Sequence, residues 1–125
     1  MTNTNSEARS NPPSVSMIEV VVETLEDAKA ENTIAIDMFG KSPMSDHMVI
    51  TSGRSQRHVG AIAIQISKAL KEKGFKNPRI EGLPNADWVL VDGGDVIIHI
   101  FRPEVREFYN LEKMWQGELA DEQPE

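Results

Sequence analysis

Aspartate, tryptophan and histidine side chains occur close together between residues 87 and 101, in the string DWVLVDGGDVIIHIF. Asp92 and Asp95 flank a Gly-Gly pair, while Trp88 precedes it and His99 follows it. Two carboxylates at a turn could bind a divalent metal ion or meet a cationic partner. An aromatic ring beside them would instead supply buried area for a protein partner. This stretch is therefore the first candidate for a functional site.

A catalytic use of these carboxylates is the first hypothesis to weigh. Metal-binding pairs for phosphoryl transfer typically lie on one strand face, two residues apart, whereas Asp92 and Asp95 flank a turn. The stretch SGRS at residues 52–55 resembles a phosphate-binding turn, but it is not a full glycine-rich loop. We therefore predict no enzyme activity and no cofactor. The alternative is a nucleotidyltransferase-like enzyme that acts on nucleotide or RNA substrates.

Histidine and serine chemistry finds little support in the sequence. His47, His58 and His99 fall on three separate predicted elements without short ligand spacing, and the chain has no cysteine, so a zinc site is not expected. No serine has a recognisable histidine and aspartate partner pattern, which argues against a hydrolase triad. Arg57 and His58 begin a long predicted helix, where His58 is expected to be neutral and hydrogen-bonded and Arg57 to be solvated, unless a partner contacts them.

The elements that must position these residues follow from periodicity and turn signals. Ser16 and Glu19 form a capping-box pattern, which predicts a helix that starts at Ser16 and stops at Asn32. Further elements are predicted as strands at 33–38 and 46–51, a helix from Ser55 to about Lys73, strands at 79–81, 87–92 and 95–101, and a helix from Pro103 that breaks near Asn110. This order predicts an α/β fold with a mixed sheet of about five strands flanked by helices.

The strands at 87–92 and 95–101 form a predicted hairpin whose two faces differ. With Gly93-Gly94 as a two-residue turn, Asp92 pairs with Asp95 and Trp88 pairs with His99. The aliphatic face must be core and carries Val89, Val91, Val96, Ile98 and Ile100. The other face carries Trp88, Leu90, Ile97, His99 and Phe101, rimmed by Asp92 and Asp95. It is either covered by helices or open to a partner, and the pattern leaves both possibilities standing.

The composition restricts the partners. The chain of 125 residues has a net charge of −7, from 20 acidic and 13 basic residues, which suits a basic protein surface better than naked nucleic acid. Such a charge also simply favours solubility. We expect a disordered tail at residues 1–15, one domain at 16–117 and an acidic tail at 118–125. The absence of cysteine and of any long apolar run leads us to expect a cytoplasmic protein without a membrane span.

Four blocks of sequence, in the right order, resemble the ribosomal silencing factor (Iojap-like) family. They are DHMVITSGRSQRHV at 46–59, Glu81-Gly82, WVLVDGGDVIIHIF at 88–101, and an ending that contains Arg106, Phe108, Tyr109, Leu111, Glu112 and Trp115. The resemblance covers roughly residues 17–117. The chain departs from the family pattern at His47 and Met48, where aromatics are common, and at Gly93, where many members carry a bulkier residue.

The resemblance implies a nucleotidyltransferase-like α/β sheet and a role in translation. It implies binding to the large ribosomal subunit through ribosomal protein number fourteen, which blocks joining of the small subunit and represses translation under nutrient limitation. We expect Trp88, Asp92, Asp95 and His99 to contact the partner, with the helix start at Arg57 and His58 as the second candidate surface. We also expect a homodimer in the free state and no direct binding of free nucleic acid.

Overall fold

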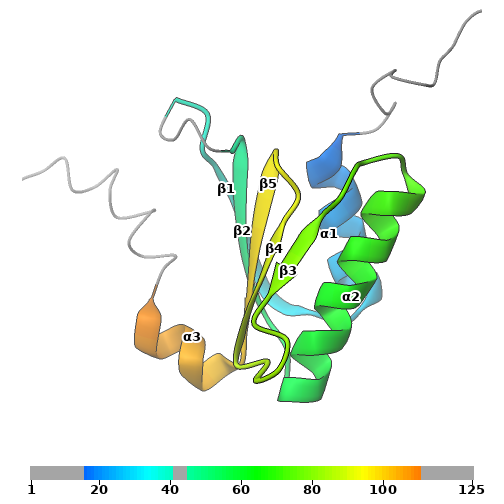
Figure 1. The fold of residues 1–125 in the computed structure, drawn as a ribbon. Coiled ribbons are helices and arrows are strands. Elements are labelled where there is room, and N and C mark those ends of the chain that lie inside the picture. Colours follow the sequence, from blue (N-terminus) through cyan, green and yellow to red (C-terminus); the bar gives the residue numbers. More distant parts are fainter. Residues whose placement is uncertain (1–15, 41–44, 111–125) are drawn as a thin grey trace, which may run out of the picture.

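The fold is a mixed β-sheet with helices on both faces (Figure 1). The computed structural model describes residues 16–40 and 45–110. The elements are α1 (Met17–Asp27), β1 (Glu31–Asp37), β2 (His47–Ser52), α2 (Gln56–Glu72), β3 (Arg79–Glu81), β4 (Trp88–Asp92), β5 (Val96–Phe101) and α3 (Pro103–Tyr109). The predicted α/β class and the five-stranded sheet are confirmed, and apart from the end of α1 the predicted boundaries agree within two residues. The specific likeness to nucleotidyltransferases stays a prediction.

The strand order in the sheet is β1-β2-β5-β4-β3. The pairs β1–β2, β4–β5 and β3–β4 are antiparallel, and β2–β5 is the parallel pair. A parallel pair needs a long crossover, and here α2, β3 and β4 lie in the connection between its two strands. The topology therefore brings β5 to the centre of the sheet, beside both β2 and β4.

Local side chains define the helix starts, as predicted. The Ser16 hydroxyl accepts a hydrogen bond from the Glu19 N–H at 3.4 Å, and the Ser55 hydroxyl accepts one from the His58 N–H at 3.1 Å. Each contact satisfies an amide that the first helical turn would leave unpaired.

The predicted end of the first helix at Asn32 is wrong. The helix α1 ends at Asp27, because Lys29 adopts the left-handed conformation (φ 63°) and the Ala30 N–H bonds to the Leu25 carbonyl at 2.9 Å. This closure usually uses glycine or asparagine, so a lysine in that position gives no signal in the sequence. Asn32 is also left-handed (φ 53°), but it lies in β1 where the register with β2 shifts.

The aliphatic face of the β4–β5 hairpin forms the main core, as predicted. Its five residues are at most 1% exposed and pack with α1 and α2. Figure 1 shows these two helices side by side over this face, with α3 on the other side of the sheet. The main core therefore lies between the sheet and the pair α1–α2, and among the described helices only α3 lies on the opposite face.

The predicted register of the hairpin is wrong by two residues. Asp92 pairs with Ile97 and Trp88 pairs with Phe101, because the two turn residues are Gly94 and Asp95, closed by the Gly93 N–H bond to the Val96 carbonyl at 3.0 Å. Gly94 has φ +97°, the positive angle that a type II′ turn places at its first central residue. Moving the turn by one position shifts the pairing by two, so every side chain keeps its predicted face.

The helix α3 begins at Pro103 and ends at Tyr109 with Asn110 as its C-cap, as the proline and the predicted break near Asn110 indicate. Asn110 is left-handed (φ 56°) and its N–H bonds to the Arg106 carbonyl at 2.7 Å. The continuation of this predicted helix, with Leu111, Met114 and Trp115, lies outside the described residues, as do both predicted tails and residues 41–44. Among the helices that are described, none has the length and apolarity needed to cross a membrane.

Candidate protein-docking surface

An aromatic cluster occupies the sheet face opposite α1 and α2. The ring centroids of Trp88 and Phe101 lie 5.0 Å apart in an edge-to-face arrangement, and those of Trp88 and His99 lie 5.9 Å apart. Phe101 is fully buried, whereas Trp88, His99 and their neighbours Leu90 and Ile97 are half-buried. Half-buried aromatic and aliphatic side chains on one face make the kind of surface that protein partners cover.

A hydrogen bond between Trp88 and His99 fixes the chemistry of the histidine. The Trp88 Nε1–H donates to His99 Nδ1 at 3.0 Å. Since the indole nitrogen can only donate, Nδ1 must be unprotonated and the imidazole carries its proton on Nε2. Burial also lowers the pKa of His99 from 6.5 to about 4, because a charged ring is poorly solvated there. His99 is therefore a neutral component of the surface at neutral pH.

The neutral state of His99 predicts a pH-dependent stability. Its pKa is lower in the folded chain, so between about pH 6.5 and pH 4 the unfolded chain binds more protons. The free energy of unfolding should fall as the pH drops through this window, by at most about 3 kcal/mol from this group. The variant His99→Gln keeps an acceptor for Trp88 but has no imidazole to protonate. When the free energy of unfolding from urea titrations is plotted against pH, its slope between about pH 4 and pH 6.5 should be smaller for this variant than for the wild type. Equal slopes for the two proteins would contradict the assignment.

The two predicted rim carboxylates have different surroundings. Asp92 is already engaged, because Oδ2 accepts from Arg79 Nη2 at 3.1 Å and Oδ1 accepts from the Gly94 N–H at 2.9 Å. Asp95 occupies the exposed turn, where its backbone carbonyl accepts from the N–H groups of Asp46 and His47. None of the described side chains pairs with the Asp95 carboxylate. Asp92 thus supports the turn, whereas Asp95 presents its charge to solvent.

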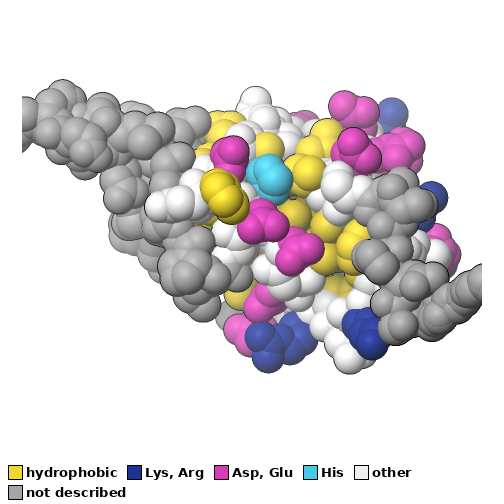
Figure 2. All heavy atoms as spheres, turned by 90° about the horizontal axis from the view of Figure 1, so that it is seen from above, with side chains coloured by type: hydrophobic (Ala, Val, Ile, Leu, Met, Phe, Trp, Pro, Cys, Tyr) yellow, Lys and Arg dark blue, Asp and Glu magenta, His cyan; other side chains and the backbone are white. Residues whose placement is uncertain are grey.

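Negative charge gathers at the end of the sheet that holds this turn. Figure 2 shows acidic side chains around a histidine and next to hydrophobic side chains on this end of the molecule. Asp37, Asp46 and Asp95 are all exposed there, and the neighbouring Phe39 is 81% exposed. Within 16–40 and 45–110, no group of three or more histidine, cysteine or acidic side chains could hold a metal ion. The charge at this end suits a cationic surface of a partner instead.

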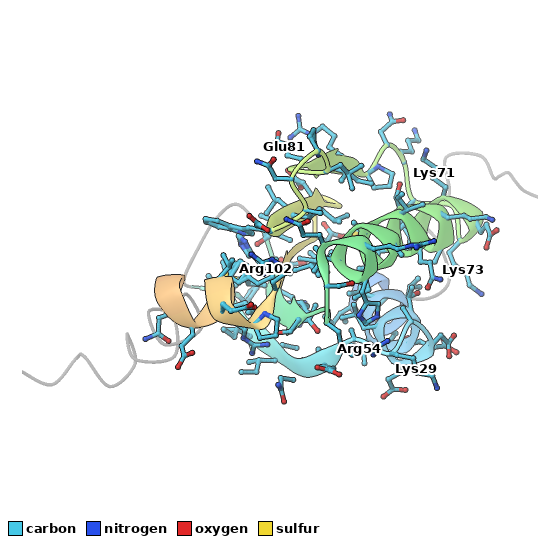
Figure 3. The ribbon with its side chains drawn as sticks, turned by 90° about the horizontal axis from the view of Figure 1, so that it is seen from below. Lys29, Arg54, Lys71, Lys73, Glu81 and Arg102 are labelled. Carbon is cyan, nitrogen blue, oxygen red and sulfur yellow. The ribbon has the colours of Figure 1, made fainter. Side chains whose placement is uncertain are left out.

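Arg57 and His58 lie away from the hairpin residues, at the start of α2 on the helix side of the sheet. His58 Nδ1 accepts from the Arg54 N–H and Nε2 donates to the Ala28 carbonyl, both at 2.9 Å, so its ring joins α2 to the end of α1. Arg57 is exposed. Figure 3 shows other basic side chains around the helix layer, among them Arg54 and Lys71. The predicted site residues therefore form two separate groups.

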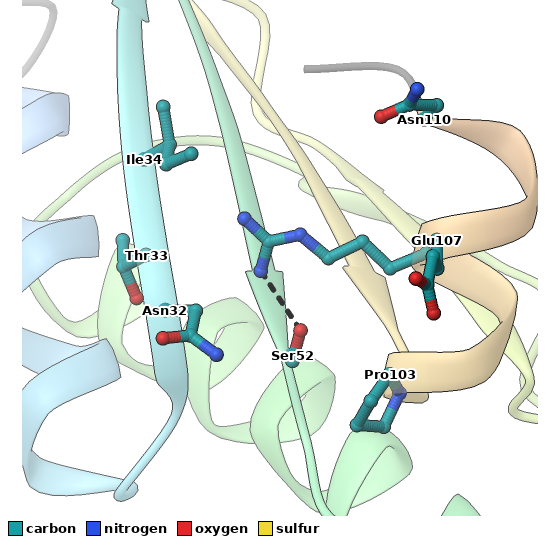
Figure 4. Close-up of a pocket in the computed structure, with 8 residues that line it drawn as sticks. Asn32, Thr33, Ile34, Ser52, Pro103, Glu107 and Asn110 are labelled. Atoms are coloured by element: carbon teal, nitrogen blue, oxygen red, sulfur yellow. Dashed lines mark hydrogen bonds between the residues drawn. The ribbon is translucent and has the colours of Figure 1, made fainter. Parts of the chain in front are cut away.

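A cleft that no sequence pattern indicated lies between β1 and α3 (Figure 4). Its volume is about 690 Å³, and the Arg106 side chain lines it, 8% exposed, with Nη1 donating to the Ser52 hydroxyl at 2.8 Å. The other lining residues are Asn32, Thr33, Ile34, Pro103, Glu107 and Asn110. Arg106 appeared in the sequence only as part of the family motif, because its partner Ser52 is 54 residues away. The cleft extends the docking face toward β1.

A polar network around Asp87, the residue before Trp88, was also not predicted from the sequence. Asp87 Oδ1 accepts from Gln56 Nε2 at 2.9 Å and from Arg102 Nε at 2.8 Å, and these two bonds lower the pKa of Asp87. The same pairing with Asp87 raises the pKa of Arg102. The network joins the ends of β4 and β5 to the start of α2, so it orients the strand that carries Trp88. Asp87 and Arg102 are 15 residues apart in the sequence, and the predicted register did not place them opposite each other, so no sequence signal indicated this pair.

Comparison with known proteins decides the family. The family model described as "Ribosomal silencing factor during starvation" matches residues 11–125. The chain belongs to the ribosomal silencing factor family. The predicted family is thereby confirmed. Its members are non-enzymatic factors that bind the ribosome, so the alternative of a nucleotidyltransferase-like enzyme is set aside.

The similarity to other members of the ribosomal silencing factor family extends over most of the chain. "Ribosomal silencing factor RsfS" of Zymomonas mobilis is 48% identical over 108 residues, which cover 86% of this chain and 81% of the relative. A mouse protein named "Mitochondrial assembly of ribosomal large subunit protein 1" is 35% identical over 85% of this chain and 48% of its own length. A crystal structure of a Chromobacterium violaceum protein matches with a TM-score of 0.77 at 35% identity, over 80% of this chain and 83% of that one.

Proposed function

We propose that the chain binds the large ribosomal subunit through ribosomal protein number fourteen, blocks association with the small subunit and represses translation under nutrient limitation. Membership of the ribosomal silencing factor family supports ribosome binding and translational regulation. The name of the mouse relative refers to the large subunit of the ribosome, which agrees with the proposed choice of subunit. The proposed place of action is the cytoplasm, because relatives of the chain include proteins of bacteria, which keep their ribosomes there.

The observation that carries the docking proposal is the half-buried aromatic face with Asp95 at its end. Trp88 supplies a rigid ring and His99 a neutral one. A partner can therefore cover both rings without the energetic cost of desolvating a charged group. The exposed carboxylate of Asp95 would meet lysine or arginine on a basic ribosomal protein. Arg57 and His58 would lie outside this contact, and Arg57 could reach ribosomal RNA only from the helix side.

We also propose that the free chain forms a homodimer through the same face. A partly apolar face without a partner favours self-association, and a two-fold dimer is the commonest arrangement. The dimer would separate when ribosomal protein number fourteen takes the face. Light scattering of the purified chain that shows a monomer at every accessible concentration would rule this out.

Sedimentation tests the proposed function. The tagged full chain in a cell lysate should co-migrate with the large subunit and be absent from joined ribosomes. Adding the purified chain to separated subunits should reduce the fraction that joins, because the chain and the small subunit would compete for one side of the large subunit. Migration with joined ribosomes, or unchanged joining at saturating protein, would contradict the proposal.

A further inference from the structure

The α1 helix carries a groove outside the docking face, at the edge of the main core, against which Ile18 packs. The groove has a volume of about 330 Å³. Ile18 and Val22 form its apolar part, and both are half-buried. The rim of the groove is formed by three exposed carboxylates, those of Glu19, Glu23 and Glu26. The spacing places the three glutamates opposite the core-facing side of α1, whereas Ile18 lies beside the core-facing Leu25 at the border of the groove.

Repulsion between the acidic side chains around this groove destabilises α1. Glu19 and Glu23 are four residues apart, and so are Glu23 and Asp27, and like charges at this spacing destabilise a helix. The last turn of α1 contains no basic residue, although the partial negative charge at a helix C-terminus favours one. Within the described parts of the chain, none of these carboxylates forms an ion pair. The buried side chains stabilise the helix, and of these acidic residues Glu19 alone lies in the first turn, where the helix dipole favours a negative charge.

We propose that this groove docks a cationic amphipathic helix of a partner protein, at a site separate from the aromatic sheet face. Apolar side chains of the partner would cover Ile18 and Val22. Its lysines or arginines would meet the three rim glutamates, whose spacing of four and three residues matches that of side chains on a facing helix. Binding would also remove the like-charge repulsion within α1. The acidic rim therefore selects the charge of the partner and the apolar part selects its amphipathic pattern.

Charge makes the chain itself a poor occupant. Residues 111–125 carry five acidic side chains and one lysine, and residues 1–15 carry one acid and one arginine. Neither segment offers the repeated positive charge that three glutamates favour. The α2 helix of a second copy offers Arg57, Lys68 and Lys71, and self-association through α1 and α2 would appear as a change of oligomeric state when α1 is altered.

A peptide-binding experiment tests the groove. The probe is a fluorescent peptide of about two heptads in which leucine recurs every three or four residues and lysine fills the other positions. Its affinity for the full chain is measured by anisotropy. The variant Glu19→Gln/Glu23→Gln/Glu26→Gln should bind about tenfold more weakly, which corresponds to three rim ion pairs of ordinary strength. Val22→Ser should also weaken binding, and raising the salt from about 0.1 M to 1 M should reduce the wild-type affinity.

Matched controls separate a site from general attraction to an acidic protein. The variant Glu72→Gln/Glu81→Gln/Glu107→Gln removes the same charge elsewhere on the chain and should keep the wild-type affinity. A shuffled peptide of equal composition should bind poorly, and Trp88→Ala should leave peptide binding unchanged. Equal losses in the two triple variants, absence of binding to the wild type, or a dimer that the α1 variant alone dissolves would overturn the proposal. The α1 variant should melt close to the wild type, because the repulsion that it removes offsets the favourable first-turn charge of Glu19 that it loses.

Discussion

Replacing Gly82 with alanine should lower the free energy of unfolding by about 3 kcal/mol or more. Gly82 has φ +97°, which strains any other residue by about 1–3 kcal/mol. A Cβ atom there would also approach the Trp88 carbonyl oxygen closer than any real contact and lie 3.3 Å from the Cα of Val89. Since both neighbours are backbone atoms of β4, a side-chain rotation cannot relieve the contact. The melting temperature should fall by more than about 10 °C.

Gly94 provides a matched control for the strain alone. It has the same φ of +97°, but a Cβ atom there meets nothing within 4 Å. Gly94→Ala should therefore cost only the conformational strain, about 1–2 kcal/mol. Calorimetry or urea unfolding of both variants measures the difference. If both variants lose the same stability, the close approach of Gly82 to the Trp88 backbone is not what requires glycine. Gly82→Ala should also weaken ribosome binding more than Gly94→Ala, because only Gly82 touches the strand of Trp88.

The sequence predicts the faces of the hairpin better than its pairing, for a geometric reason. Alternation alone assigns Val89 and Ile98 to the core and Trp88 and His99 to the opposite face, and it survives an error of two residues in register. The turn position was wrong because two adjacent glycines fit several turns. Gly93 lies outside the turn. A Cβ there would come within 2.7 Å of Met17 Sδ, so a larger residue at this position needs the flexible Met17 side chain to move.

Other features depended on contacts that sequence patterns do not contain. The end of α1 at a left-handed Lys29 has no residue-type signal, and the stop at Asn32 was the reasonable choice without it. The cleft beside Arg106 requires α3 to lie against β1 and β2, which only the tertiary fold determines. The separation of His58 from the hairpin also follows from the fold, because its ring joins α1 to α2. Local sequence signals predicted the helix starts correctly, because a single side chain determines each of them: the caps Ser16 and Ser55, and Pro103.

Replacing Trp88 with alanine should weaken binding to the large ribosomal subunit by about 2 kcal/mol or more, or about thirtyfold in Kd. The indole is the largest half-buried ring on the proposed docking face, and it also holds His99 through the Nε1–H bond. Alanine would remove the area that a partner covers and would leave His99 Nδ1 without its donor. Trp88→Phe should retain part of the affinity, because it keeps a ring beside Phe101 but loses the hydrogen bond. Co-sedimentation with purified large subunits gives the Kd values.

One control variant and one matched pair of variants separate docking from folding. Ile64→Ala removes a 53% exposed apolar side chain from the outer side of α2 and should leave Kd unchanged. Asp95→Lys should weaken binding and alter its salt dependence, whereas Glu72→Lys makes the same charge change on α2 and should do neither.

Thermal melts must accompany each Kd, because Trp88 also contacts Phe101 and its loss will cost some stability. If Trp88→Ala and Asp95→Lys stay folded at the assay temperature and sediment as tightly as the wild type, this face is not the docking surface. The exposed Arg57 at the start of α2 would then be the next residue to vary, because it lies on the opposite side of the sheet.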